Sequence, residues 1–156
     1  MAATAVFFDT SVLLAGLLDL GAPSESAQRI MDALAAGKLA RPRTAWHCCL
    51  EFYAVSTRLP EELRLTPAQA GQLLAAEIRA RMEVVGLSQG RWDEFWTRAQ
   101  TERVAGGRIY DAHIAEVARQ HKAKIVVTDN TRHFASLLAH GIQVLSCEQF
   151  AGRLSR

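Results

Sequence analysis

Four acidic residues stand at positions where they could share one site. Asp9 and Asp129 each directly follow an apolar, strand-like run, in the segments VFFDTSVLL and IVVTDN. Asp111 comes shortly after a pair of glycines and begins a predicted helix, while Glu51 lies inside another predicted helix. Ligands of an open parallel sheet bind beyond the carboxyl ends of its strands. We therefore expect the four acids to converge at that edge, with Glu51 reaching it from the flank of its helix.

Four carboxylates held close together would repel one another, and some of them would be forced to keep a proton. A bound divalent cation removes this conflict. Ligands that offer only oxygen select hard ions, so the pattern favours Mg²⁺ or Mn²⁺, with water completing the shell. Such a centre can activate water and hold phosphoryl oxygens, which is the chemistry of metal-assisted phosphodiester hydrolysis.

Taken singly, each acid also has an ordinary structural explanation. Asp9 could cap a helix, Asp111 could interact with a helix dipole, and Asp129 could form an Asx turn. Glu51 could be a partly exposed helix residue. The joint pattern favours a site, because three acids in separate segments fall where a strand or a glycine loop reaches the same edge.

The elements that would position these acids alternate between strands and helices, which predicts an α/β fold with a parallel sheet in one domain, residues 1–156. The predicted strands cover residues 4–8, 82–87, 124–128 and 142–145, and 41–43 is read as a turn or a short edge segment. Helices are predicted over residues 11–18, 24–36 and 66–80, the last of them capped by Thr66. Another helix is capped by Thr44 and ends near Pro60. Three more begin at Ser88, at Asp111 and shortly after Asp129.

Composition is that of an ordinary globular protein, with 49% hydrophobic and 22% charged residues in 156. A net charge of +2 does not by itself indicate nucleic-acid binding, although most of the 18 basic residues are arginine. No stretch resembles a membrane span or a secretory signal. The three cysteines, of which Cys48 and Cys49 are adjacent, favour unpaired thiols and a cytoplasmic location.

The segments FFDTSVLL, LEFYAV, IYDAHIAEVA and IVVTDNTRHF, in this order, resemble the PIN-domain nucleases. The chain is most similar to the VapC-type toxins of bacterial and archaeal toxin–antitoxin pairs, over residues 4–150. The resemblance implies a Rossmann-like, three-layer α/β/α sandwich. It also implies an endoribonuclease that depends on Mg²⁺ or Mn²⁺ and acts as the toxin of a type II pair. Implied partners are RNA as substrate, a second copy in a homodimer, and an antitoxin protein whose tail blocks the site.

On this resemblance Asp9, Glu51 and Asp111 match the three core acids. Asp129 matches a fourth and less constant acidic position, a role that Asn130 could share. The hydroxyl group after the first acid, from Thr10 or Ser11, would orient a metal-bound water or a phosphate.

Other residues suggest further roles. Arg108, which follows two glycines and precedes Asp111, is the best candidate for a contact with an RNA phosphate. Trp92 and Trp96 lie four residues apart on one predicted helix, which favours packing or a dimer face over base stacking. His47 is spaced to meet Glu51 and His133 to meet Asp129, which favours surface or supporting histidines over a transition-metal site. Cys48 is more simply a small core residue than a nucleophile.

Three rival functions fit less well. A haloacid-dehalogenase-like phosphohydrolase would need a second acid at position 11, where the chain has Ser11. A receiver-like signalling domain would need an acidic pair near the first strand and a lysine after a late strand. A non-catalytic PIN-like binding domain would not need all four acids, which this chain keeps.

Overall fold

A parallel sheet of five strands runs through the structure, a computed structural model that describes residues 4–154. The strand order is β3-β2-β1-β4-β5, so the first strand of the chain lies in the middle of the sheet. Its strands are β1 (Val6–Phe8), β2 (Pro42–Ala45), β3 (Glu83–Val85), β4 (Ile125–Val127) and β5 (Gln143–Leu145). This arrangement confirms the predicted parallel α/β fold.

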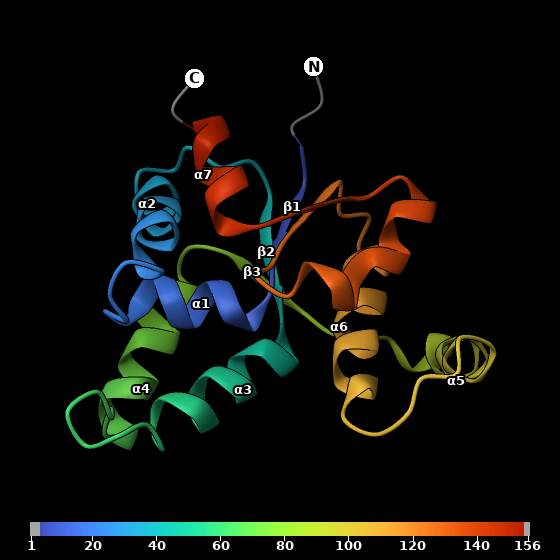
Figure 1. Cartoon of the computed structure of the whole chain (residues 1–156), viewed down its shortest axis with the longest axis horizontal. Coiled ribbons are helices and arrows are strands. Elements are labelled where there is room, and N and C mark those ends of the chain that lie inside the picture. Colours follow the sequence, from blue (N-terminus) through green and yellow to red (C-terminus); the bar gives the residue numbers. More distant parts are fainter. Residues whose placement is uncertain (1–3, 155–156) are drawn as a thin grey trace.

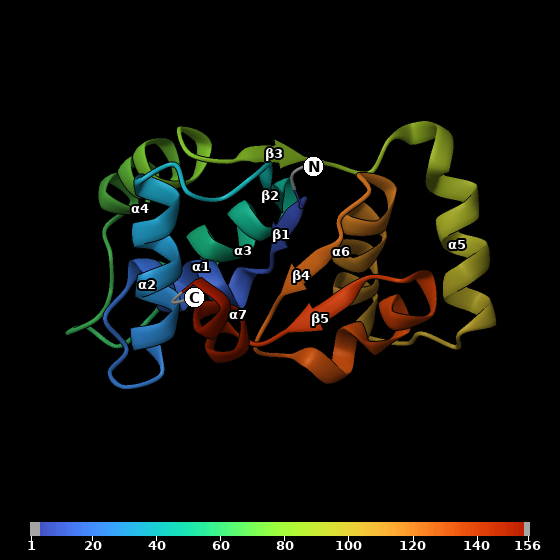
Figure 2. The same ribbon diagram turned by 90° about the horizontal axis from the view of Figure 1, so that it is seen from above.

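Helices cover both faces of this sheet and make the three layers that the resemblance implied (Figures 1 and 2). One side carries α1 (Thr10–Leu17), α2 (Ser24–Ala35), α3 (Trp46–Ser56), α4 (Pro67–Leu73) and α7 (Cys147–Leu154). The other side carries α5 (Trp92–Thr101) and α6 (Arg108–Gln120), with η3 (Thr131–His140) packed on α6. Two short turns complete the chain: the π-helical η1 (Leu74–Arg79) and the 3-10 turn η2 (Gln89–Arg91).

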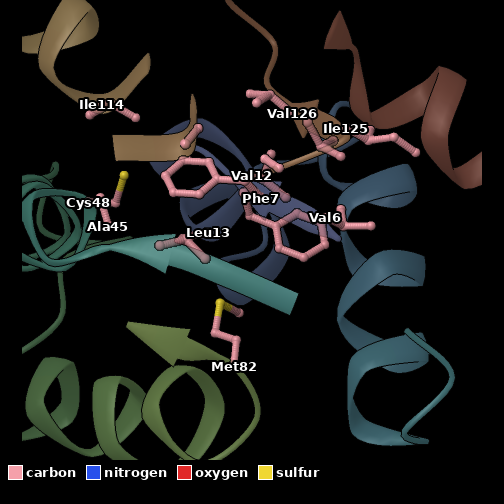
Figure 3. Close-up of a cluster of buried hydrophobic side chains, with 14 of the residues drawn as sticks. Val6, Phe7, Val12, Leu13, Ala45, Cys48, Met82, Ile114, Ile125 and Val126 are labelled. Atoms are coloured by element: carbon pink, nitrogen blue, oxygen red, sulfur yellow. The ribbon is translucent and has the colours of Figure 1, made fainter. Parts of the chain in front are cut away.

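The central strands are apolar throughout because helices bury both of their faces. Every residue of β1 and β4 is buried, and Phe7 and Val126 have no exposed surface. Figure 3 shows Phe7 among side chains from several elements, including Leu13, Ala45 and Ile114. The strand that carries Asp9 to the sheet edge is therefore fixed by the core on both sides.

Residues 41–43 are predicted as a turn or a short edge segment, but Pro42 and Arg43 belong to β2, and only Arg41 lies in a bend before the strand. This strand lies inside the sheet and pairs with both β1 and β3. Pro42 is its first residue, a position where proline costs no ladder hydrogen bond. Thr44 was predicted to cap the next helix, which is also wrong: it lies in β2, and its Oγ1 donates to the carbonyl of Phe8 at 2.8 Å.

Two helices begin with the same reciprocal cap, and the sequence reading found only one of them. The cap predicted at Thr66 is confirmed, because its side chain accepts from the backbone N–H of Gln69 while the Gln69 side chain accepts from the Thr66 N–H. Ser146 and Gln149 make the same pair of bonds at the start of α7. The Ser-x-x-Gln spacing was a readable signal for a helix that was not predicted.

The cysteine side chains lie in the interior of the fold. Cys48, Cys49 and Cys147 are all buried and free, so the prediction of unpaired thiols is confirmed. Within residues 4–154, no helix combines the length and the apolar character needed to cross a membrane.

Candidate active site

Asp9 directly follows β1 in the chain and is almost fully buried, with 3% of its surface exposed. Its backbone N–H donates to Val127 in the neighbouring strand at 3.0 Å, which continues the ladder by one bond. Its carboxylate oxygen Oδ2 accepts from Thr128 Oγ1 at 2.7 Å and from Ser11 Oγ at 3.3 Å. The sheet and two hydroxyl groups therefore hold this acid in one orientation.

Burial raises the pKa of Asp9 from 3.8 to about 6. The main cause is the loss of water around the charged form, and the negative charges of Asp111 and Glu51 add to it. Hydrogen bonds from the Thr128 side chain and the Thr10 backbone act in the opposite direction. Asp111 and Glu51 are the two acids whose charges act on Asp9 in this way.

Glu51 reaches the site from α3, with its side chain 39% exposed. Its Oε1 accepts a hydrogen bond from Thr10 Oγ1 at 3.2 Å, so the hydroxyl that follows Asp9 links the two acids. The same oxygen lies 3.2 Å from Nε2 of His47, one helical turn earlier. The predicted pairing of His47 with Glu51 is therefore present, and it is a contact within one helix.

Asp111 lies in the first turn of α6, and its side chain is 27% exposed. Its Oδ2 is 2.7 Å from Nδ1 of His133 in η3. A carboxylate can only accept, so this ring nitrogen carries the proton. The sequence reading paired His133 with Asp129 by spacing, and that pairing is wrong: the histidine turns to the acid of another element.

Asp129, the residue after Thr128, is held by hydrogen bonds to α7 and to Ser11. Its Oδ1 accepts from the backbone N–H of Cys147 at 3.1 Å, so the carboxylate satisfies the start of α7. Its own N–H donates to Ser11 Oγ at 3.1 Å. Asn130 is exposed, and its N–H donates to Thr128 Oγ1 at 3.0 Å. In this conformation neither side chain makes a described bond to Asp9, Glu51 or Asp111.

The three gathered acids have the donor chemistry of a metal site without forming a closed one. Among residues 4–154, no three His, Cys, Asp or Glu side chains stand close enough to hold one metal ion as they are. Carboxylate oxygens are nevertheless the ligands that Mg²⁺ and Mn²⁺ prefer, and a cation would offset the repulsion that raises the pKa of Asp9. In the histidine contacts Glu51 uses Oε1 and Asp111 uses Oδ2, and each carboxylate has a second oxygen.

Glu116, five residues after Asp111, belongs to a separate cluster, as its position about 140° around the helix predicted. It is 3% exposed, and it accepts from Arg119 and lies 3.3 Å from Arg98 Nε. Both arginines also contact Glu94 on α5. This cluster ties α5 to α6 and takes no part in the acidic site.

An apolar cleft lies next to the acidic site, and His47, which contacts Glu51, is part of its wall. His47 stacks on Tyr110 with 5.4 Å between the ring centroids, and Trp92 and Trp96 line the same cleft. The two tryptophans are 50% and 52% exposed, so they do not pack in the core of this chain. Trp96 nevertheless contacts the buried ring of Phe95, with 5.1 Å between the ring centroids, so this tryptophan combines local packing with an exposed face.

The most important supporting residue that the sequence reading missed is Thr128, which donates the shortest bond to Asp9. A hydroxyl beside an acid in the string VVTDN was a weak signal, because its role depends on β4 being the neighbour of β1. Arg108, the predicted phosphate contact, is exposed at the first residue of α6 and lines a pocket next to His133.

These features define a class of protein: a three-layer α/β/α domain with a parallel sheet and acidic residues at the carboxyl ends of its strands. The family model of the PIN domain matches residues 6–137, so the chain belongs to the PIN-domain family. The dehalogenase-like and receiver-like alternatives are thereby set aside.

Comparisons with known proteins agree with this family. Ribonuclease VapC27 of Mycobacterium tuberculosis is 36% identical over 84 residues, which are 53% of this chain and 58% of that protein. The structure of VapC20 of M. tuberculosis, described as a toxin that cleaves the sarcin-ricin loop, has a TM-score of 0.65 at 18% identity and covers 85% of this chain and 95% of its own. DNA-bound VapBC of Salmonella typhimurium has a TM-score of 0.63 at 18% identity, covering 92% and 98%.

Proposed function

We propose that this chain is a metal-dependent endoribonuclease that acts as the toxin of a type II toxin–antitoxin pair. The observation that carries the proposal is the gathering of Asp9, Glu51 and Asp111 at the centre of the sheet edge in a PIN-domain chain. Its likeness to VapC27, named a ribonuclease, supports RNA as the substrate.

In this proposal Asp9, Glu51 and Asp111 hold Mg²⁺ or Mn²⁺. The bound ion supplies an acidified water and positive charge for the phosphoryl oxygens. The chain's own groups position the ligands: Thr128 and Ser11 fix the Asp9 carboxylate, and the Thr10 hydroxyl fixes Glu51. Hydrolysis then consists of attack by water on phosphorus and cleavage of one ester bond of the RNA strand.

Asp129 and Asn130, predicted for the fourth position, have a different role in this proposal. We assign Asp129 to the support of α7, because its carboxylate is already used by the N–H of Cys147. Substitution Asp129→Asn keeps an oxygen that can accept this bond, so we expect it to retain most of the activity.

The proposal is tested with RNA cleavage in Mg²⁺ or Mn²⁺ by the wild type, Asp9→Asn, Asp111→Asn and Asp129→Asn. We expect the first two variants to lose at least about a hundredfold in rate, since each removes a negative charge that would hold the metal ion in the site. Cleavage by Asp9→Asn at the wild-type rate would rule out the proposed site. A strong loss in Asp129→Asn alone would return Asp129 to the ligand set.

We also propose an antitoxin protein and a second copy of this chain as partners, and a cytoplasmic location. Likeness to chains of VapBC assemblies supports the antitoxin. The exposed aromatic side chains around the apolar cleft support self-association, since such patches are uncommon on monomers. Light scattering of the wild type and Trp96→Glu tests the homodimer, and a wild type that stays monomeric at high concentration would exclude it.

A further inference from the structure

A polar pocket lies beside Asp111, between α5, α6 and η3. His133, which bonds to Asp111 at 2.7 Å, is part of its wall, so the pocket opens next to the acidic site. Its cavity of about 150 Å³ has room for a phosphoryl group. Five arginines line it, and we name it the arginine pocket after them: Arg98, Arg103, Arg108, Arg119 and Arg132.

Two of the five arginine side chains are paired with carboxylates, and the other three are not. Arg98 and Arg119 pair with the carboxylates of Glu94 and Glu116. The side chains of the other three make no hydrogen bond or ion pair with any residue that the structure describes, and all three residues are exposed: Arg103, Arg108 and Arg132. The arginine pocket thus presents three free guanidinium groups, one from each of the segments around it.

Arg103 has a backbone conformation that is unusual for its residue type. It follows the end of α5 with a φ of 55°, in the left-handed region that glycine adopts most easily. Its N–H donates to Gln100, and the next N–H, of Val104, donates back to Ala99, which closes the helix end. A residue with a long cationic side chain stands here although a glycine would fit the backbone better.

The acidic site alone repels its proposed substrate. Asp9, Glu51 and Asp111 are negative, and an RNA strand carries a negative charge at every nucleotide. Attraction before metal binding must come from cations nearby. Guanidinium groups suit this role because their planar forks match phosphate oxygens and are always charged.

We propose that the arginine pocket binds a backbone phosphate of the RNA strand, one beside the phosphodiester to be cleaved. This inference rests on the proposed ribonuclease function and extends it to Arg103 and Arg132. An acidic peptide is the other polyanion that three arginines could bind. RNA is favoured because His133, in the wall of the pocket, contacts Asp111 of the acidic site where a phosphodiester would lie.

Binding of fluorescein-labelled single-stranded RNA, followed by anisotropy in EDTA, tests the proposal without cleavage. We expect Arg103→Gln, Arg108→Gln and Arg132→Gln each to weaken binding about threefold and the triple variant roughly thirtyfold. Loss of the one proposed phosphate contact in the triple variant lowers the dependence of log affinity on log salt by about 0.7 for a single strand. The matched control is Arg58→Gln, an exposed arginine after α3 that lines neither site, and it should bind like the wild type.

Arg103→Gly guards against a loss caused by misfolding, because it removes the charge while relaxing the left-handed backbone. Weaker binding by Arg103→Gly with an unchanged melting temperature supports the proposal. Triple-variant binding equal to wild type, or an equal loss in Arg58→Gln, overturns it. Displacement of the RNA by polyglutamate of matched charge at equal concentration also overturns the proposal. A wild type that neither binds nor cleaves RNA would instead remove the proposed function, whereas a cleaving wild type with an unaffected triple variant removes only this inference.

Discussion

Neutralising Asp9 should stabilise the metal-free protein, and more so at high pH. The pKa of Asp9 rises from 3.8 to about 6 because folding buries it near two other acids. A raised pKa means that the folded state holds the proton more tightly than the unfolded chain does. The stability contributed by this group is therefore fully present below about pH 3.8 and is lost as the pH rises through about 6.

The magnitude follows from this rise. At pH 8 the wild type has lost about 3 kcal/mol relative to a protonated Asp9, and at pH 5 about 1.6 kcal/mol. Asn cannot ionise, so Asp9→Asn avoids both losses. It also weakens acceptance from Thr128 or Ser11, at a cost of about 1 kcal/mol that does not depend on pH. The net gain is about 2 kcal/mol at pH 8 and about 0.6 kcal/mol at pH 5.

The assay is urea unfolding followed by circular dichroism, with EDTA present, at pH 8 and pH 5. The decisive quantity is the difference between the two gains, about 1.4 kcal/mol, because the lost hydrogen bond cancels from it. Asp32→Asn, an exposed position on α2, serves as control and should change stability by less than about 0.5 kcal/mol at either pH. If Asp9→Asn raises the free energy of unfolding by the same amount at both pH values, the explanation by a buried carboxylate with a raised pKa is refuted.

Two further predictions concern the core. Gly16→Ala places a methyl group 2.6 Å from Met31 Cγ and 3.1 Å from the Ala27 carbonyl, and should destabilise the fold by about 1–3 kcal/mol. The control is Gly71→Ala, a helix position with open space around it, which should stabilise the fold by up to about 1 kcal/mol. Both variants are compared with the wild type by thermal unfolding, and equal changes in stability for the two would contradict this packing argument. Burial raises the pKa of the Cys48 and Cys147 thiols to about 12 each and also raises that of Cys49. An aromatic disulfide reagent at pH 8 should therefore titrate almost no thiol in the folded protein and three in guanidinium, and rapid reaction of the folded form would contradict the burial.

The sequence predicted Asp9 and Asp111 from local rules, because an acid after a buried strand or a glycine loop must reach the sheet edge. It could not separate Asp129 from them. Side chains alternate in direction along an extended chain, so Thr128 turns to Asp9 while the next residue turns to α7. Which of the two faces the site depends on strand order, which a local pattern does not contain.

The same limit explains the other errors. β2 was predicted as an edge or turn because of Pro42, and only its pairing on both sides shows that it is an inner strand. His133 was matched to an acid four residues away, but packing of η3 on α6 brings it to Asp111. In each case a contact between distant segments decided the outcome.

The bond between Thr128 and Asp9 joins residues 119 positions apart, and this has a consequence for the protein's synthesis. Asp9 is synthesised well before the helix that carries Asp111 and the strand β4 beside it, because both lie about a hundred residues or more further along the chain. Contacts of such long sequence separation close only after the intervening chain is available. A growing chain therefore carries no assembled acidic site, and the proposed ribonuclease stays inert on the ribosome until β4 and Thr128 have been translated and have left the ribosome.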